Sequence, residues 1–302
     1  METAAAVYQD TLWGSPQGQR ALAYVRDRRI PDAVTRACRV GFADGHSLEA
    51  YLRRRSGLRI AQSLGLLRRA DDKGGSARPL REFFAGRIVV PEVREGRCIW
   101  FIGRRLDDSP AAAVRAKYLS LEGERPILGL ERAAGRRVAF VCEGVFDWLT
   151  AVAWELAASS PCGTYVPPER LAFLAHAQTI YGVFDADVAG RAAAARLQVQ
   201  FGDRFLPVAL PDGWDLNDLL QREGPAGRRT FWRLVDAARV QAPSMPHLAQ
   251  RTDTTPVSPV TATATPGVPA TSPTAATSAT SASAATATPQ PMPAGASHVH
   301  QD

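Results

Sequence analysis

The middle of the chain alternates short apolar runs with amphipathic segments, and this alternation limits the fold more than any other feature. From Arg137 to about Leu210, apolar runs of roughly four to six residues alternate with segments of helical periodicity. Apolar strands joined by helices form a mostly parallel sheet with helices on both faces. The predicted strands lie near Val138–Cys142, Pro161–Gly163, Thr179–Phe184 and Phe205–Leu210, and the predicted helices near Phe146–Ala157, Pro168–Ala175, Ala189–Phe201, Leu216–Gln221 and Arg228–Val240.

The region before this α/β pattern predicts a mixed α+β subdomain over residues 1–135. Two β-rich runs, Arg87–Val93 and Cys98–Leu106, flank a Glu-Gly turn and predict a hairpin, with Pro91 at a strand edge or end. Arg53, Arg54 and Arg55 are interpreted as a solvated helix face. The predicted helices lie at Gln19–Arg28, Pro31–Arg36, Leu48–Leu52 and Ile60–Leu67.

The α/β pattern defines a second domain over residues 136–241, and the composition changes after it. Residues 242–302 are mostly Ala, Thr, Ser and Pro, with almost no large apolar side chains. Such a stretch buries too little apolar area to offset the entropy of ordering it. We therefore predict a disordered C-terminal tail.

Charge and cysteine content narrow the class of protein. The formal net charge is +6, and the excess is almost entirely arginine, since Lys73 and Lys117 are the only lysines. A basic protein with an acidic cluster inside it fits a polyanion held at a metal site. The four cysteines form no CxxC pair, so we expect no zinc site. The sequence has no signal peptide and no long apolar run, which predicts a cytoplasmic protein without membrane contact.

Acidic clusters follow the predicted strands, where the ligands of α/β sheets bind. They are Glu143, the pair Asp185 and Asp187, and the pair Asp215 and Asp218. Each cluster has a structural explanation of its own: Glu143 can end a strand at the surface, and Asp187 and Asp215 can cap helices. Together, however, ionised carboxylates repel one another unless a hard divalent cation lies between them. The pattern therefore predicts a Mg²⁺ site and phosphate chemistry.

The motifs that carry these acids resemble those of a known family. The runs CEGVFDWLTAVAW, FDADVAGRAAAARL and LPDGWDLNDLL resemble the TOPRIM domain of DnaG-type bacterial primases. Upstream, the runs LWGSPQGQRALAYVRDRRIP, CRVGFAD, FFAGRIVVP, IWFIGRRLDD, AKYL and ILGL resemble the basic N-terminal half of the primase RNA-polymerase core. The resemblance covers about residues 8–240. TOPRIM motifs also occur in topoisomerases and some nucleases, so the upstream runs are what single out primases.

The resemblance implies a Rossmann-like TOPRIM fold and a DNA-directed RNA polymerase that synthesises short RNA primers on single-stranded DNA from NTPs. It assigns Glu143, Asp185 and Asp187 as catalytic residues that hold Mg²⁺ or Mn²⁺, with Asp215 or Asp218 as a further acidic contributor. It also places Arg87, Arg104 and Lys117 in the groove for template and nucleotide phosphates. A replicative helicase or a separate zinc-binding primase subunit is the partner that the resemblance suggests.

The sequence departs from the family pattern at several positions. Ala186 stands where the family has glycine, Asn217 replaces an aspartate, and Gly123 stands where a second lysine is usual. The zinc-binding and helicase-binding domains of the family are not recognisable. Two alternatives therefore stay open: a TOPRIM nuclease, and a non-catalytic single-strand-binding relic of a phage or mobile-element primase.

Overall fold

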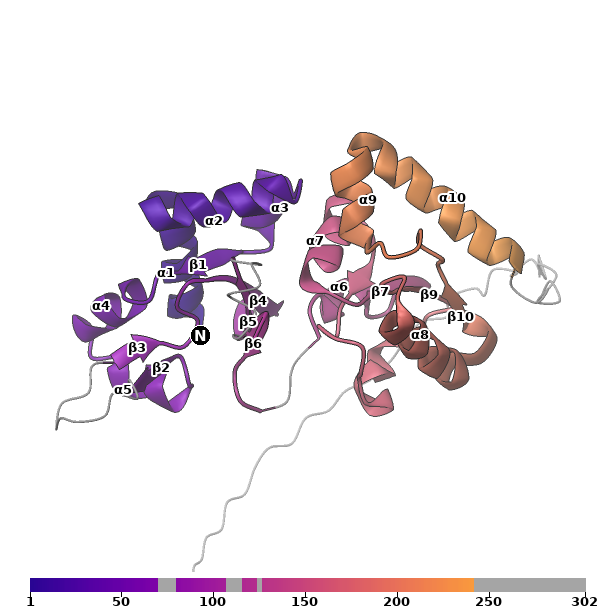
Figure 1. Ribbon diagram of the computed structural model, residues 1–302. Helices are drawn as coiled ribbons and strands as arrows, with labels where there is room; N and C mark the ends of the chain where they lie inside the picture. Colours follow the sequence, from indigo (N-terminus) through magenta and orange to yellow (C-terminus); the bar gives the residue numbers. More distant parts are fainter. Residues whose placement is uncertain (70–79, 107–115, 124–126, 242–302) are drawn as a thin grey trace, which may run out of the picture. The chain divides into compact units, whose positions relative to one another are not determined.

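The computed structural model describes residues 1–69, 80–106, 116–123 and 127–241, and all of them fall in one compact unit. The predicted disordered tail, residues 242–302, lies outside the described residues. Within the described part of the chain, no helix is long and apolar enough to cross a membrane. The predicted mixed α/β fold is confirmed: the described residues form a four-stranded antiparallel sheet, a four-stranded parallel sheet and a small two-stranded antiparallel sheet (Figure 1).

The first sheet is antiparallel and contains the predicted hairpin. Glu95 and Gly96 form its turn with φ values of 49° and 73°, the left-handed pair that a type I′ turn requires. The short strand Gly41–Ala43 pairs with the first strand of the hairpin only as far as Val89. Pro91 lies beyond this pairing, as expected for a residue that has no N–H to donate. The strand order is β1 (Gly41–Ala43), β4 (Arg87–Arg94), β5 (Arg97–Arg105) and β6 (Tyr118–Ser120).

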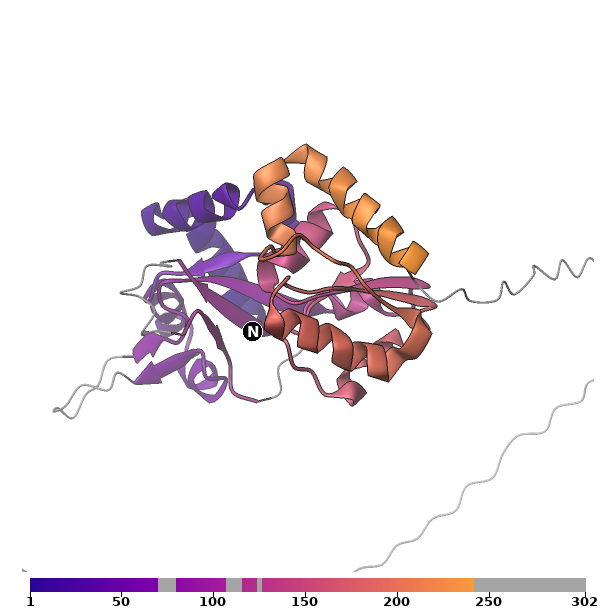
Figure 2. The same ribbon diagram turned by 45° about the vertical axis from the view of Figure 1, so that its right-hand side comes forward.

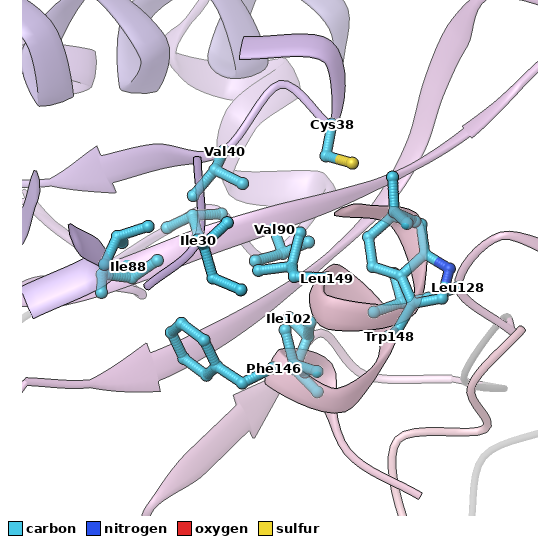
Figure 3. Packing of buried hydrophobic residues seen from close by; sticks show 14 of the residues in the cluster. Ile30, Cys38, Val40, Ile88, Val90, Ile102, Leu128, Phe146, Trp148 and Leu149 are labelled. Atoms are coloured by element: carbon cyan, nitrogen blue, oxygen red, sulfur yellow. The ribbon is translucent and has the colours of Figure 1, made fainter. Parts of the chain in front are cut away.

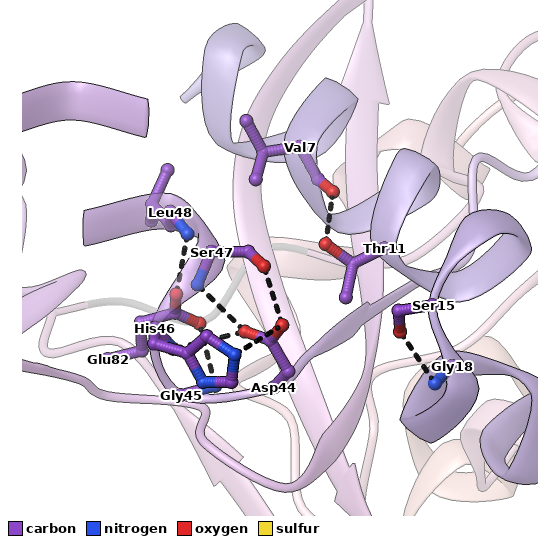
Figure 4. Close-up of polar contacts among 10 residues, drawn as sticks. All are labelled: Val7, Thr11, Ser15, Gly18, Asp44, Gly45, His46, Ser47, Leu48 and Glu82. Carbon is purple, nitrogen blue, oxygen red and sulfur yellow. Dashed lines mark hydrogen bonds and ion pairs between the residues drawn. The ribbon is translucent and has the colours of Figure 1, made fainter. Parts of the chain in front are cut away.

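Short helices and a two-stranded sheet surround this antiparallel sheet. The Ser15 hydroxyl accepts a hydrogen bond of 2.9 Å from the Gly18 N–H and caps the second helix, which Pro16 begins (Figure 4). The first helix was not predicted, and the predicted helix at Ile60–Leu67 ends early because Gly65 adopts φ 73°. The elements are α1 (Glu2–Gly14), α2 (Pro16–Asp27), α3 (Asp32–Ala37), α4 (Ser47–Arg53), α5 (Leu58–Ser63), β2 (Leu67–Arg69) and β3 (Leu80–Glu82).

The second sheet is parallel throughout. One predicted strand is displaced: pairing with the central strand involves Ala158 and Ser159, not Pro161–Gly163. Pro161 has no N–H to donate, and Cys162 turns the chain with φ 56°, so the ladder ends before them. The order is β10 (Phe205–Pro207), β9 (Thr179–Val183), β7 (Val138–Cys142) and β8 (Ala158–Ser159).

Helices cover both faces of the parallel sheet, as predicted. Alternate residues of β7 point to opposite faces, so Phe140 stacks on Tyr181 and contacts Phe231, while Val141 packs in a second cluster with Leu197. Figures 1 and 2 show α10 and α8 on opposite sides of the strands. The helices are α6 (Leu130–Ala133), α7 (Val145–Ala153), η2 (Pro168–Leu174, a 3₁₀ helix), α8 (Val188–Phe201), η3 (Gly202–Arg204, also 3₁₀), α9 (Leu216–Glu223) and α10 (Pro225–Gln241).

Helix α7 joins the two sheets into one hydrophobic core. Its residues Phe146 and Leu149 are buried, and they lie against Ile88, Val90 and Ile102 of the antiparallel sheet (Figure 3). Because α7 begins directly after β7, this packing fixes the carboxyl edge of the parallel sheet beside strand β5. The residues at that edge form the candidate site.

Candidate active site

A cavity of about 210 Å³ opens where the carboxyl edge of the parallel sheet meets strands β5 and β6. Its acidic side comes from the loops after β7 and β9, from the first turn of α7 and from the start of α9. Its basic side comes from the residue after α2, from β5 and from the residue before β6. The acidic lining residues are Glu143, Asp147, Asp185 and Asp215, and the basic ones are Arg28, Arg104 and Lys117.

Glu143 and Asp185 lie next to each other at the ends of β7 and β9. The main-chain N–H of Asp185 donates to a Glu143 carboxylate oxygen at 3.4 Å, and both residues are half-buried. Burial, followed by repulsion from Glu143, Asp215 and Asp187, raises the pKa of Asp185 to about 7. Burial also raises the pKa of Glu143, with repulsion from Asp187 and Asp215 acting in the same direction.

Asp147 is the acidic lining residue that the sequence assignment left out. Its carboxylate is buried and accepts hydrogen bonds from the N–H groups of Gly144 and Asn217, both at 3.1 Å. Burial and the negative charges of Asp215 and Asp185 raise its pKa well above the usual range. The spacing of the CEGVFD run carried the signal, since Asp147 is the last residue of that motif. We assign Asp147 to holding the start of α7 against α9.

Asp187 and Asp215 act as helix caps, the structural explanation that each had from sequence. Asp187 accepts from the Gly190 N–H at 2.7 Å, and Asp215 accepts from the Asp218 N–H at 2.6 Å. Asp218 returns the bond by accepting from the Asp215 N–H at 3.3 Å, which completes a capping box. Each cap occupies one carboxylate oxygen and fixes the orientation of the other.

Of these capping residues, only Asp215 lines the cavity in the described part of the chain. Asp215 lines the cavity, and burial and repulsion from Asp218 raise its pKa, while Arg28 and Lys117 oppose that rise. Asp187 is exposed, and neither Asp187 nor Asp218 is among the lining residues in the described part of the chain.

The three predicted basic residues have different surroundings. Lys117 is exposed and lines the cavity, where its charge lowers the pKa of Asp185. Arg104 also lines the cavity but is buried, and it donates to the Tyr24 hydroxyl at 2.7 Å. Arg87 is buried and donates to the main-chain oxygens of Ala116 at 2.8 Å and Lys117 at 3.1 Å. Arg87 therefore anchors the segment that carries Lys117.

Arg28 was not predicted from the sequence. Its guanidinium lies over the rings of Tyr24 and Phe146 and donates to the Asn217 side chain at 3.3 Å. This position puts a cation opposite Asp215. Arg28 lies within the primase-like run LWGSPQGQRALAYVRDRRIP, but nothing in that run distinguishes it from the other arginines. Its place in the site depends on contacts with Phe146 of α7 and Asn217 of α9.

The chemistry of the acidic residues fits a hard divalent cation. Carboxylate oxygens are the ligands that Mg²⁺ and Mn²⁺ take. Burial first, and repulsion from neighbouring carboxylates second, raise the pKa values of Glu143 and Asp185, and a bound cation would oppose both effects. Among the described residues, however, no three His, Cys, Asp or Glu side chains are arranged closely enough to hold a metal ion. The four cysteines are free, and Cys38, Cys98 and Cys142 are buried.

The chain matches two families of known proteins. Residues 7–124 match the family described as DNA primase catalytic core, N-terminal domain, and residues 140–220 match the Toprim-like family. The two matches occur in the order that the resemblance predicted. The chain belongs to the DnaG-type primase family.

Individual primases are similar over the same region. The DNA primase of Myxococcus xanthus is 28% identical over 247 residues, which are 75% of this chain and 39% of that protein. The DNA primase of Mycobacterium tuberculosis is 30% identical over 253 residues, which are 75% of this chain and 38% of that protein. The chain thus spans about two fifths of the length of these curated primases.

A solved structure confirms that the similarity extends to the primase core fold. The RNA polymerase domain of Mycobacterium tuberculosis primase DnaG superposes with a TM-score of 0.64 at 27% identity, covering 77% of this chain and 80% of that domain. The match to the primase core therefore includes both the antiparallel sheet and the Toprim sheet, and the cavity lies between these two primase elements.

Proposed function

We propose that this chain is the catalytic core of a DNA primase that condenses ribonucleotides into short RNA primers on single-stranded DNA, using Mg²⁺ or Mn²⁺. The observation that carries the proposal is the cavity in which Glu143, Asp185 and Asp215 face Lys117 and two arginines. A phosphate-binding cavity needs positive charge for the polyanion, and a metal-dependent transfer needs oxygen ligands on the opposite wall. The pairing of both in one cavity supports nucleotidyl transfer.

The residues divide the proposed chemistry between them. A divalent ion held at the acidic side would lower the pKa of an attacking hydroxyl and would neutralise charge on the transferred phosphate. Glu143, Asp185 and Asp215 would offer such an ion carboxylate oxygens from three separate loops. Lys117 is exposed and flexible enough to follow a nucleotide phosphate. Arg104, held by Tyr24, offers a fixed positive charge beside it.

The template in this proposal is single-stranded DNA. Support comes from the Mycobacterium tuberculosis RNA polymerase domain, 27% identical, whose structure was determined with a double-stranded DNA oligomer that has a 6-nucleotide overhang. A helicase, a separate zinc-binding subunit and a cytoplasmic location stay predictions. They play no part in the assay below.

The test is primer synthesis by the full chain on single-stranded DNA with labelled NTPs and either Mg²⁺ or Mn²⁺. We expect Glu143→Gln and Asp185→Asn to lower synthesis by about 100-fold or more, because each removes a charge from the proposed metal site without changing its shape. The matched controls are Glu169→Gln and Asp236→Asn, which make the same changes at exposed positions that do not line the cavity. Both controls should retain full synthesis.

Three outcomes would count against the proposal. Metal-dependent cleavage of labelled DNA without NTPs, abolished by the same variants, would identify a nuclease. Salt-sensitive single-strand binding with no metal-dependent chemistry would identify a binding protein. Synthesis that survives in both Glu143→Gln and Asp185→Asn would place the active site elsewhere.

A further inference from the structure

A second cavity, remote from the acidic residues, lies between α4, α5 and the first turn of α1. We call it the α4–α5 groove; its volume is about 260 Å³ and its apolar lining includes Leu48, Leu52, Ile60, Ala61, Leu64 and Leu66. Helices α4 and α5 are neighbours in the ribbon, beside β2 and β3 (Figure 1). None of the acidic residues of the candidate active site lines this groove.

The rim of the groove exposes large apolar side chains. Ile60 is 66% exposed, and Leu64 and Tyr51 are 38% and 36% exposed. Three such residues around one concave surface form a contiguous apolar patch, whereas isolated exposed apolar residues are ordinary. The patch has the room and the surface to take a large apolar side chain from a partner.

The segment that forms the groove is rich in positive charge. Residues 47–69 contain six arginines and a single acidic residue, Glu49, which pairs with Arg53. Arg54, Arg55 and Arg59 are exposed, and Arg55 lines the groove, with its guanidinium 4.0 Å from the centre of the Tyr51 ring. The arginine run interpreted from sequence as a solvated face therefore borders an apolar groove.

A tight turn holds the groove in shape. Ser56 adopts φ 57°, and Gly57 lies so close to Leu52 that a β-carbon at that position would come within 2.7 Å of the leucine side chain. The Gly57 N–H donates to the Leu52 main-chain oxygen at 3.1 Å. The α4–α5 connection is thus fixed by local geometry, and the groove is pre-formed.

We propose that the α4–α5 groove binds a short acidic peptide segment of a partner protein, with apolar side chains in the groove and carboxylates against Arg55 and the exposed arginines of the same segment. Charge complementarity selects the acidic partner, and the aliphatic lining selects a peptide with large apolar residues. Single-stranded nucleic acid is the less favoured occupant, because its bases stack on open aromatic rings and Arg55 covers one face of Tyr51. The segment therefore binds by apolar anchoring plus charge.

The test uses a short fluorescein-labelled peptide of Asp and Glu residues that also carries Leu and Phe, with binding to the full chain measured by fluorescence anisotropy. Ile60→Glu and Arg55→Glu should each weaken binding by about tenfold, since one places a charge in the apolar patch and the other reverses a groove charge. Val199→Glu and Arg229→Glu make the same changes at exposed positions on α8 and α10 and should leave binding within about twofold.

Two further probes decide between occupants. The same peptide with serine in place of Leu and Phe should bind at least about tenfold more weakly, and a labelled oligo-dT should be insensitive to Ile60→Glu. Equal binding of the serine peptide, or loss of oligo-dT binding in Ile60→Glu, would overturn the proposal. So would peptide binding that appears only after residues 242–302 are removed, because the tail would then be the occupant.

The inference does not depend on the proposed synthesis of primers. Peptide binding is measured without NTPs or metal, and Ile60→Glu should retain the primer synthesis of the unmodified chain. A chain that binds the peptide but makes no primer would contradict only the proposed function. Peptide affinity unchanged by both Ile60→Glu and Arg55→Glu, in a chain that still makes primers, would contradict only the groove.

Discussion

The side-chain amide of Asn217 donates a hydrogen bond of 2.9 Å to the Thr150 hydroxyl, and both residues are completely buried. The same amide donates to the Arg28 main-chain oxygen at 3.0 Å, and the Asn217 N–H donates to Asp147. One side chain thus ties α9 to α7 and to the end of α2. An aspartate, which the resemblance to primases leads us to expect at this position, has no amide to donate.

We expect Asn217→Asp to lower the free energy of unfolding by about 2–4 kcal/mol at pH 7.5, because it buries a carboxylate against a main-chain oxygen. Burial would raise the folded pKa of that carboxyl, so the loss should shrink as the pH falls toward 5 and the protonated group donates again. Urea unfolding at both pH values measures this. Gln19→Glu, the same kind of change at an exposed position, should stay within about 0.5 kcal/mol at both pH values.

We expect Glu82 to make the stability of the protein depend on pH. Its buried carboxylate accepts from the Leu48 N–H at 2.6 Å and the Gly45 N–H at 3.3 Å, at the start of α4 (Figure 4). Burial, and to a smaller degree repulsion from Asp44, raises its pKa to about 7. Because the folded protein holds this proton more tightly than the unfolded chain, the contribution is complete below about pH 4.5 and is lost as the pH rises through about 7.

The variant Glu82→Gln should remove that contribution. Relative to the unmodified chain, its free energy of unfolding should rise by up to about 3 kcal/mol between pH 4.5 and 8, as measured by denaturant unfolding across this range. Glu169→Gln, at an exposed position, should follow the unmodified chain at every pH. A constant difference between Glu82→Gln and the unmodified chain would show that Glu82 stays ionised in the folded protein.

We expect Arg87 to position the chain and Lys117 to contact phosphate, and variants of the two residues should differ accordingly. Arg87→Met should lower the free energy of unfolding by about 2–3 kcal/mol, because it removes the side-chain donor of the Ala116 main-chain oxygen and one of two donors to the Lys117 oxygen. Lys117→Met should leave stability within about 0.5 kcal/mol but reduce the salt dependence of single-strand binding by about one unit of slope. Denaturant unfolding and salt titrations of binding measure both. An equal reduction of slope in Arg87→Met would make Arg87 a phosphate ligand.

The sequence predicted the elements whose signals are local. The β7 and β9 runs, the α8 pattern and the hairpin turn at Glu95 and Gly96 each carry their own periodicity or turn residues, and all appear in the structure. The predicted position of β8 was wrong because the strand forms where the chain pairs with β7 and ends before Pro161 and Cys162. Asp147 was left out of the site although the CEGVFD spacing contained it. Arg28 was missed for another reason: it reaches the cavity through contacts with Phe146 of α7 and Asn217 of α9, which are distant in the sequence.

Variants of Asp187 can distinguish its role as a helix cap from a role of its negative charge in the active site. Its carboxylate accepts from the Gly190 N–H at 2.7 Å at the start of α8. Asn is also a good cap, so Asp187→Asn should keep stability within about 0.5 kcal/mol, whereas Asp187→Ala should lose about 1 kcal/mol in urea unfolding. If the charge serves the metal, primer synthesis should fall by about tenfold or more in both variants.

The control for this comparison is Ser15→Ala, which removes the analogous cap from α2, away from the cavity. It should lose about 1 kcal/mol of stability and retain primer synthesis well below its unfolding temperature. Stability and synthesis would then vary independently: Ser15→Ala loses only stability, Asp187→Asn loses only synthesis, and Asp187→Ala loses both. Full synthesis by Asp187→Asn would instead restrict Asp187 to capping α8 and leave Glu143, Asp185 and Asp215 as the acidic residues of the site.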